Sequence, residues 1–340
     1  MAGITIDDIA QELGIANSTV SRALRDDPRI SDRVIRDVKR AANRLGYVPN
    51  IAAQSLRTGK SKMIGFLVRD IRDGLSAEMI PEVEAACAEH SFGLLLCNSD
   101  NDPHRERYYL QILRQRQVEG VLLLTPTSPT NDPYLAVRQA MPLVLVDMEV
   151  DEDSLCAVTV DHVMGGYLAT KYLLDLGHRR IAYLSGPLHL SPCTRVVKGY
   201  EQAMAEAGVP PEEHLVVVSE RTDIAAGREG MLSFLKISPQ PTAMAVVSDM
   251  MAVGALDAAR KHGIRVPADF SIIGYDDIPM ASVMTPPLTT VAQDRQALGR
   301  LAVQLLLDEI NEEEHHHRQE IVAPRLVVRD STAPPPEAAK

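Results

Sequence analysis

Residues 5–24 read TIDDIAQELGIANSTVSRAL, and their apolar positions repeat at helical spacing on both sides of Gly14. Thr5 is a suitable N-cap, and Asp8, three residues later, is its capping partner. Gly14 supplies a tight turn. The pattern predicts two short helices: Thr5–Leu13 and Asn17–Leu24.

A third amphipathic helix is predicted directly after this pair. It spans Ser31–Leu45, with Ser31 as N-cap and Ile30 packed on Ile35. Three helices this short bury little surface, so we expect a small unit of marginal stability.

The charge is distributed unevenly along the chain. Residues 1–62 hold 11 Lys and Arg against 7 Asp and Glu, a net of +4, whereas the whole chain carries −11, which leaves −15 on the rest. A local positive excess suits phosphate contacts, but a solvated helical surface would carry it equally well. Short polar side chains at the start of the second helix favour DNA, because they let that helix enter the major groove.

Two pairs of segments carry a family resemblance. Thr5–Ala10 and Gly14–Leu24 resemble the signature of the lac/gal repressor (LacI) family, and Leu45–Asn50 with Ala52–Leu56 resembles its hinge. The similarity continues through the body and covers essentially the entire chain. The resemblance implies a homodimeric, sequence-specific transcriptional regulator, most consistent with a repressor, that binds near-palindromic double-stranded DNA under control of a small effector.

The DNA-contacting side chains come partly from the helix pattern and partly from the resemblance. Asn17, Ser18 and Arg22 are placed to reach base edges. The resemblance implies that Leu56 wedges into the minor groove and kinks the duplex; packing of Leu56 on its own subunit is the alternative. The full predicted set is Thr5, Asn17, Ser18, Thr19, Ser21, Arg22, Asn50, Gln54, Leu56 and Arg57.

From Met63 onward, short apolar runs alternate with amphipathic helices, which predicts parallel sheets covered by helices on both faces. About 280 residues exceed one comfortable core, so two lobes are expected. The resemblance implies a type I periplasmic-binding-protein-like α/β body, with crossovers near Asp161, Thr289 and Ile321. The predicted strands are Ile64–Val68, Phe92–Cys97, Val121–Leu124, Leu143–Val146, Ala157–Val160, Ile181–Ser185, Leu215–Val218, Ala243–Val247 and Ser271–Gly274.

These patterns divide the chain into four parts. Residues 1–48 form the helix-turn-helix DNA-binding domain, and 49–62 form a hinge helix and linker. Residues 63–330 form the two-lobed effector-binding and dimerisation domain. A disordered tail is expected over 331–340, whose three prolines fit no heptad pattern, so a dimer is expected and a tetramerising coiled coil is not.

Polar residues follow several strands, at the edge where ligands of open α/β sheets bind. Each aspartate could instead cap the following helix. The resemblance places ligand contacts at Asp147, Ser248 and Asp276, and an arginine three residues before Gly199, where this chain has Val196; its neighbour Arg195 is therefore chosen. The predicted effector site is Asp70, Leu75, Ser76, Asp147, Arg195, Thr222, Ser248, Asp249 and Asp276.

The ligand class follows from residues that depart from the family pattern. Ser76 and Thr222 stand where relatives often carry a stacking aromatic, and the chain has no Trp and four Phe. Arg69, Arg72 and Arg221 are also predicted near the site. A sugar or small anionic sugar derivative is expected rather than a purine; a nucleoside and a protein corepressor remain alternatives.

Other functions lack their motifs. The chain has no GxGxxG, Walker, GxSxG or HExxH sequence, so neither an enzyme nor a cofactor is expected. No export signal and no apolar run of about 18 residues is found, which predicts a cytoplasmic protein without a membrane anchor and disfavours the rival interpretation, a sugar-binding receptor without DNA function. The run His315–His317 is not expected to bind a metal, because consecutive helical residues point about 100° apart.

Overall fold

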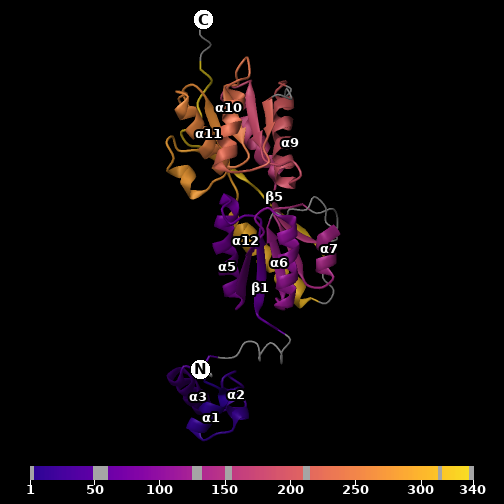
Figure 1. Cartoon of the computed structure of the whole chain (residues 1–340), viewed down its shortest axis with the longest axis vertical. Helices are drawn as coiled ribbons and strands as arrows, with labels where there is room; N and C mark the ends of the chain where they lie inside the picture. The colour runs from indigo at the N-terminus through magenta and orange to yellow at the C-terminus, as the bar shows by residue number, and fades with distance from the viewer. Residues whose placement is uncertain are drawn as a thin grey trace. The chain divides into compact units, whose positions relative to one another are not determined.

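The computed structural model describes residues 4–48, 60–124, 132–149, 155–209, 215–312 and 316–336. The chain divides into two compact units between Ser61 and Lys62. The predicted hinge, residues 49–59, lies outside the described residues. Figure 1 shows the helical amino-terminal unit and the α/β body, which are described separately below.

The amino-terminal unit, here called the headpiece, consists of α1 (Ile6–Leu13), α2 (Asn17–Ala23) and α3 (Asp32–Leu45). The predicted capping box is present: the Thr5 backbone N–H donates to the Asp8 carboxylate at 2.7 Å, and the Asp8 N–H donates to the Thr5 hydroxyl. Gly14 takes the left-handed conformation that the turn requires, with φ of 62°. Ser31 is the N-cap of α3, as predicted, although its side chain makes no capping hydrogen bond.

The headpiece core is small. Its fully packed side chains are Ile, Val and Ala from all three helices: Ile9, Ala10, Val20, Ala23, Val38, Ala41 and Ala42. Ile30 and Ile35 pack against this core, as predicted.

The first lobe of the body contains a six-stranded sheet in the order β11-β5-β4-β3-β1-β2. All its pairings are parallel. Its strands are β1 (Met63–Val68), β2 (Gly93–Asn98), β3 (Gly120–Leu124), β4 (Leu143–Val146), β5 (Cys156–Val160) and β11 (Gln319–Val322). Its helices are α5 (Gly74–Glu89), α6 (Pro103–Gln115), α7 (Asp132–Arg138) and α12 (Arg295–Asn311).

The second lobe repeats this arrangement with the order β12-β10-β9-β8-β6-β7, and β12 is antiparallel to β10. Its strands are β6 (Ile181–Ser185), β7 (Val216–Val218), β8 (Ala243–Val246), β9 (Ser271–Asp276), β10 (Thr289–Ala292) and β12 (Arg325–Val327). Its helices are α8 (His162–Asp175), α9 (Ser191–Glu206), α10 (Ile224–Phe234) and α11 (Asp249–Lys261), with a 3₁₀ turn at Pro279–Ser282.

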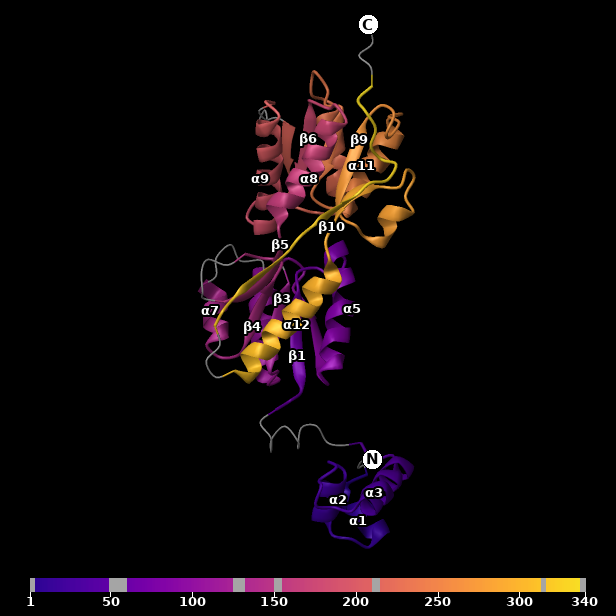
Figure 2. The same ribbon diagram turned by 180° about the vertical axis from the view of Figure 1, so that it is seen from behind.

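The chain passes between the lobes three times. It crosses after β5 at Asp161, between β10 and α12, and between β11 and β12, close to the three predicted positions. Figure 2 shows α12 lying along the first lobe and the yellow segment that holds β11 and β12 running from one lobe to the other. Apolar clusters pack on both faces of the first-lobe sheet, and a further apolar cluster surrounds the second-lobe sheet.

The carboxyl-terminal segment is ordered where disorder was expected. The Ser331 hydroxyl donates to the Ile272 carbonyl at 2.6 Å and accepts from the Thr289 N–H at 2.8 Å, and Ser331 is fully buried. The Ala333 N–H donates to the Ser271 hydroxyl. The predicted disordered tail is therefore wrong for residues 331–333, because their polar groups are satisfied by the second lobe.

Candidate functional site

A pocket lies where the carboxyl ends of strands from the two lobes face each other. Its inner part, here called the inner pocket, has a volume of about 50 Å³. Arg69 and Asp147 reach it after β1 and β4 of the first lobe, and Ser248 and Asp276 reach it from β8 and β9 of the second. In open α/β sheets this edge is the usual place for a ligand.

Three buried polar groups connect the lobes through the inner pocket. The His162 Nε2 atom lies 2.7 Å from the Asp147 carboxylate, and its Nδ1 atom lies 3.0 Å from the Tyr275 hydroxyl. Asp147 belongs to the first lobe, whereas His162 and Tyr275 belong to the second. Because a buried polar group is costly without its partner, these hydrogen bonds favour the observed position of one lobe against the other.

Asp276 is held in an unusual environment. Its backbone φ is 111°, a conformation that L side chains rarely adopt, and Asp147 also has a positive φ of 57°. Such strain costs about 1–3 kcal/mol and is concentrated at functional sites. Burial, with the nearby Asp249 and Asp73 carboxyls, raises the pKa of Asp276 well above its ordinary value. The Gln293 amide donates to one Asp276 oxygen at 2.7 Å.

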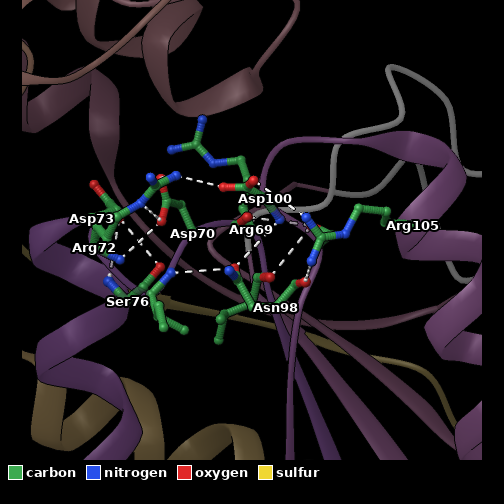
Figure 3. Close-up of polar contacts among 11 residues, drawn as sticks. Arg69, Asp70, Arg72, Asp73, Ser76, Asn98, Asp100 and Arg105 are labelled. Atoms are coloured by element: carbon green, nitrogen blue, oxygen red, sulfur yellow. Dashed lines mark hydrogen bonds and ion pairs between the residues drawn. The ribbon is translucent and has the colours of Figure 1, made fainter.

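Arg69 carries a guanidinium without a described partner. Its Nε atom is buried and has no hydrogen-bond acceptor among the described residues. Burial raises the pKa of Asp73, the N-cap of α5, and the nearby Arg69 guanidinium partly offsets this rise. Figure 3 shows Arg69 in the polar cluster at the end of β1. An arginine in this state has donors available for a ligand.

The outer part of the pocket is wider, about 680 Å³, and its other arginines are engaged. Arg72 donates to Asp70 at 2.9 Å and also bonds Asp100 (Figure 3). Partial burial alone would raise the pKa of Asp70, but the hydrogen bonds from Arg72 lower it overall. Arg221 pairs with Asp223 and Glu229. These exposed pairs define the mouth of the pocket rather than its binding centre.

Six of the nine predicted effector residues line the pocket. Leu75, Asp147, Ser248 and Asp276 line the inner part, Asp70 lines the outer part, and Thr222 lines both. Ser248 also caps α11, since its hydroxyl accepts from the Met250 N–H at 3.2 Å.

The other three residues do not line the inner pocket. Ser76 is buried in the first turn of α5, where its hydroxyl bonds Asp73. Asp249 is buried behind the site, where it accepts from the Thr290 hydroxyl at 2.7 Å and from the Ile278 N–H. Both therefore support the fold around the pocket.

Arg195 points to a different surface. It pairs with Glu149 and lines a separate hollow with Tyr167 and Glu206, whereas Val196 faces the inner pocket. Adjacent residues of a helix point about 100° apart, so the one-residue offset turns Arg195 away from the site. Arg195 therefore lies outside the inner pocket, where the sequence had placed it.

Sequence reasoning missed several pocket residues: Asp73, His162, Tyr275 and Gln293. The sequence did contain a signal for His162. It follows Asp161, directly after a predicted strand, and therefore begins a helix at the same edge of the sheet. Asp73 similarly begins the helix after β1. No local pattern distinguishes Tyr275 or Gln293.

The predicted DNA-contacting residues of α2 lie on its outer side. Asn17, Ser18 and Arg22 are exposed, and Thr19 and Ser21 are half-buried. The Asn17 amide bonds Asp7, a neighbour on α1. Thr5 is exposed with its hydroxyl engaged in the capping box. Four further predicted contacts lie outside the described residues: Asn50, Gln54, Leu56 and Arg57.

Comparison with known proteins agrees with this architecture. Residues 5–50 match "Bacterial regulatory proteins, lacI family", and residues 170–332 match "Periplasmic binding protein-like domain". The ribose operon repressor of Haemophilus influenzae is 36% identical over 96% of this chain and 98% of that protein. The transcriptional regulator DegA of Bacillus subtilis is 35% identical over 97% and 98%.

Solved structures give the same result. The lac repressor dimer bound to operator and the anti-inducer ONPF matches 98% of this chain and all of that one, with a TM-score of 0.87 and 25% identity. A LacI-family regulator from Enterococcus faecium with bound ribose matches 80% of this chain and 99% of that one, with a TM-score of 0.72 and 29% identity. The two-unit architecture is that of DNA-binding transcriptional regulators. The chain belongs to the lacI family of these regulators.

Among the described residues, no helix is both long and apolar enough to span a membrane.

Proposed function

We propose that the protein is a homodimeric, sequence-specific transcriptional repressor whose operator affinity is set by a neutral sugar bound between the lobes. The observation that carries the proposal is the buried polar chain from Asp147 through His162 to Tyr275, which joins both lobes inside the pocket. A ligand that exchanges hydrogen bonds with this chain acts on the angle between the lobes. Such a regulator acts in the cytoplasm and needs no catalysis or cofactor.

The pocket chemistry supports a polyhydroxyl ligand. Carboxyls of Asp73, Asp147 and Asp276 and the amide of Gln293 offer paired hydrogen bonds to sugar hydroxyls. Because burial raises the pKa of Asp276 and Asp73, these carboxyls can donate as well as accept hydrogen bonds, which suits the hydroxyls of a neutral sugar. Relatives named ribose operon repressors and the ribose-bound structure are consistent with this choice.

The volume of the inner pocket supports a coupled motion. About 50 Å³ is far below the roughly 300–1,000 Å³ of typical small-molecule pockets, so on this proposal a sugar enters this part after the lobes have moved relative to each other. The displacement is transmitted to the segment that precedes β1. Any effect on the operator is reciprocal: if the sugar weakens DNA binding tenfold, DNA weakens sugar binding tenfold, about 1.4 kcal/mol.

On the DNA side, two α2 helices of a dimer are proposed to read two half-sites of a near-palindromic operator. Asn17, Ser18 and Arg22 supply base-edge contacts, and surrounding basic residues supply phosphate contacts. Leu56 is proposed as the minor-groove wedge at the centre. Leu56→Ala is then expected to weaken operator binding and to leave sugar affinity unchanged.

A thermal-shift screen tests the ligand assignment. D-ribose, cellobiose, sugar phosphates and nucleosides are added separately, because a ligand of the folded state raises the melting temperature by mass action. A neutral sugar should give the largest shift and should change operator affinity without being turned over. Asp276→Ala should remove that shift, and Asp269→Ala, a surface aspartate of the same lobe, should retain it. A shift with sugar phosphates or nucleosides alone would contradict the neutral-sugar assignment.

A further inference from the structure

Outside the pocket, a cysteine, a glutamate and a histidine meet on the first lobe. Their ligand atoms, the Cys156 sulfur, a Glu309 carboxylate oxygen and a His317 ring nitrogen, all lie within 4.8 Å of one another. Cys156 opens β5, Glu309 lies near the end of α12, and His317 precedes β11. None of these residues takes part in the effector site or in the headpiece.

Two of the three separations between these ligand atoms fit one tetrahedral metal ion. The Cys156 Sγ atom is 3.8 Å from His317 Nδ1, and His317 Nδ1 is 3.4 Å from Glu309 Oε1. Zinc ligand distances of about 2.3 Å to sulfur and about 2.0 Å to nitrogen and oxygen, at tetrahedral angles, require separations of about 3.6 Å and about 3.3 Å. Both separations in the protein are within about 0.2 Å of these values.

Glu309 gives independent support. Its carboxylate side chain is 4% exposed, and its Oε1 atom makes no hydrogen bond of good geometry among the described residues, although it lies 3.4 Å from the His317 ring nitrogen. Its other oxygen accepts from the Leu143 N–H at 3.2 Å, which fixes the carboxylate orientation. A buried carboxylate oxygen without a donor is costly unless a cation satisfies it.

We propose that Cys156, Glu309 and His317 form a zinc-binding site. A thiolate and a carboxylate neutralise the two charges of Zn²⁺, and sulfur, nitrogen and oxygen are all donors that zinc accepts in proteins. The thiol loses its proton when the metal binds. Water completes the fourth position.

An ion bound at this site would join segments that are distant in the sequence. Each ligand comes from a different segment of the first lobe: the start of β5, the end of α12 and the approach to β11. Figure 2 shows α12 and the crossing yellow segment on the same side of the first lobe. The ion therefore cross-links these three segments within the first lobe and stabilises this lobe. The consecutive histidines at 315–317 were not expected to bind one metal ion together. In the proposed site the partners of His317 are instead Cys156 and Glu309, which come from distant segments.

Metal titration of the full-length protein tests the proposal. Chelator-treated protein is titrated with Zn²⁺ and, separately, with Co²⁺, whose thiolate charge-transfer band and tetrahedral visible bands report sulfur coordination. One equivalent per chain, a thiolate–cobalt band and a Zn²⁺-dependent rise in melting temperature are expected. Cys156→Ser should abolish the band, and His317→Gln should weaken binding at least tenfold.

Two matched controls separate this site from incidental binding. Cys87→Ser removes another buried cysteine, and His316→Gln removes the exposed neighbouring histidine; both should retain the band and the stoichiometry. Because His317 is partly exposed, His317→Gln remains informative if Cys156→Ser fails to fold. Absence of the thiolate–cobalt band in the wild-type protein, or equal Zn²⁺ affinity in wild type and His317→Gln, would overturn the proposal.

Discussion

The headpiece and the body place their charged side chains in opposite environments. Headpiece pairs such as Lys39 with Asp26 lie on the surface, where solvent screens them. In the body, Asp147, Asp249 and Asp276 are buried among hydrogen-bond partners. The headpiece thus keeps its charge available to a phosphate backbone, and the body buries carboxyl groups where a small ligand can change the balance of hydrogen bonds. Substitutions in the two units should therefore have separable effects.

The largest effect is expected from the headpiece core. Ile9 is fully buried, and Ile9→Ala costs about 2–5 kcal/mol, comparable with the whole stability of so small a unit. Operator binding, measured by fluorescence anisotropy, should fall at least a hundredfold while the sugar-induced thermal shift of the body persists. The partly exposed Ile4→Ala should bind operator normally. Loss of the sugar response in Ile9→Ala would show that the units are not separable.

A smaller effect is expected from Arg69→Met. Charge-assisted hydrogen bonds contribute about 1.5–3 kcal/mol, so sugar affinity measured by calorimetry should fall about tenfold to a hundredfold. Because the Arg69 Nε atom has no described partner, the melting temperature of the ligand-free protein should not fall. Arg72→Met, which breaks surface pairs, should leave sugar affinity within a few-fold. Unchanged sugar affinity in Arg69→Met would remove Arg69 from the site.

A comparable or smaller effect is expected from Asn17→Ala on α2. A base-edge contact is worth about 1–3 kcal/mol and acts at one position of the operator. Binding to a set of single-base operator variants should therefore become less selective at one position, by about tenfold. A uniform loss across all variants would instead identify Asn17 as a phosphate contact.

The smallest effect is a pH dependence of stability. The pKa of Asp276 is raised in the folded protein because burial disfavours its charge, so its contribution to stability is full below the unfolded pKa near 4 and is lost as the pH rises towards the folded value. Asp276→Asn stays neutral and should match wild type at about pH 4 but be more stable at pH 8, in urea unfolding without ligand. A difference that does not change with pH would contradict this environment for Asp276.

The sequence was sufficient for the architecture because its periodicities were strong. The nine predicted strands are present within one or two residues, and the three crossovers lie close to their predicted positions. The strands β10, β11 and β12 were not predicted, because none is a continuous apolar run: β10 begins with two threonines, β11 with Gln319 and Glu320, and β12 with Arg325. The order of residues 331–333 depends on hydrogen bonds to distant strands, which no local pattern reveals.

The site was less predictable than the fold. Strand-end aspartates were singled out from the sequence, but sequence does not say which of them face the pocket: Asp147 and Asp276 do, and Asp249 points behind it. The Arg195 prediction failed because a single-residue offset on a helix changes the face. His162 and Tyr275 were missed because their roles come from the approach of two lobes, which is a tertiary property.

The most direct test of the account is a pair of affinity measurements on one preparation. Operator affinity is measured with and without saturating sugar from the screen, and sugar affinity is measured with and without saturating operator. If the inner pocket is coupled to the headpiece, the two affinities change by the same factor, and Asp276→Ala removes both changes while operator binding persists. A sugar that binds the inner pocket and leaves operator affinity unchanged would contradict the account.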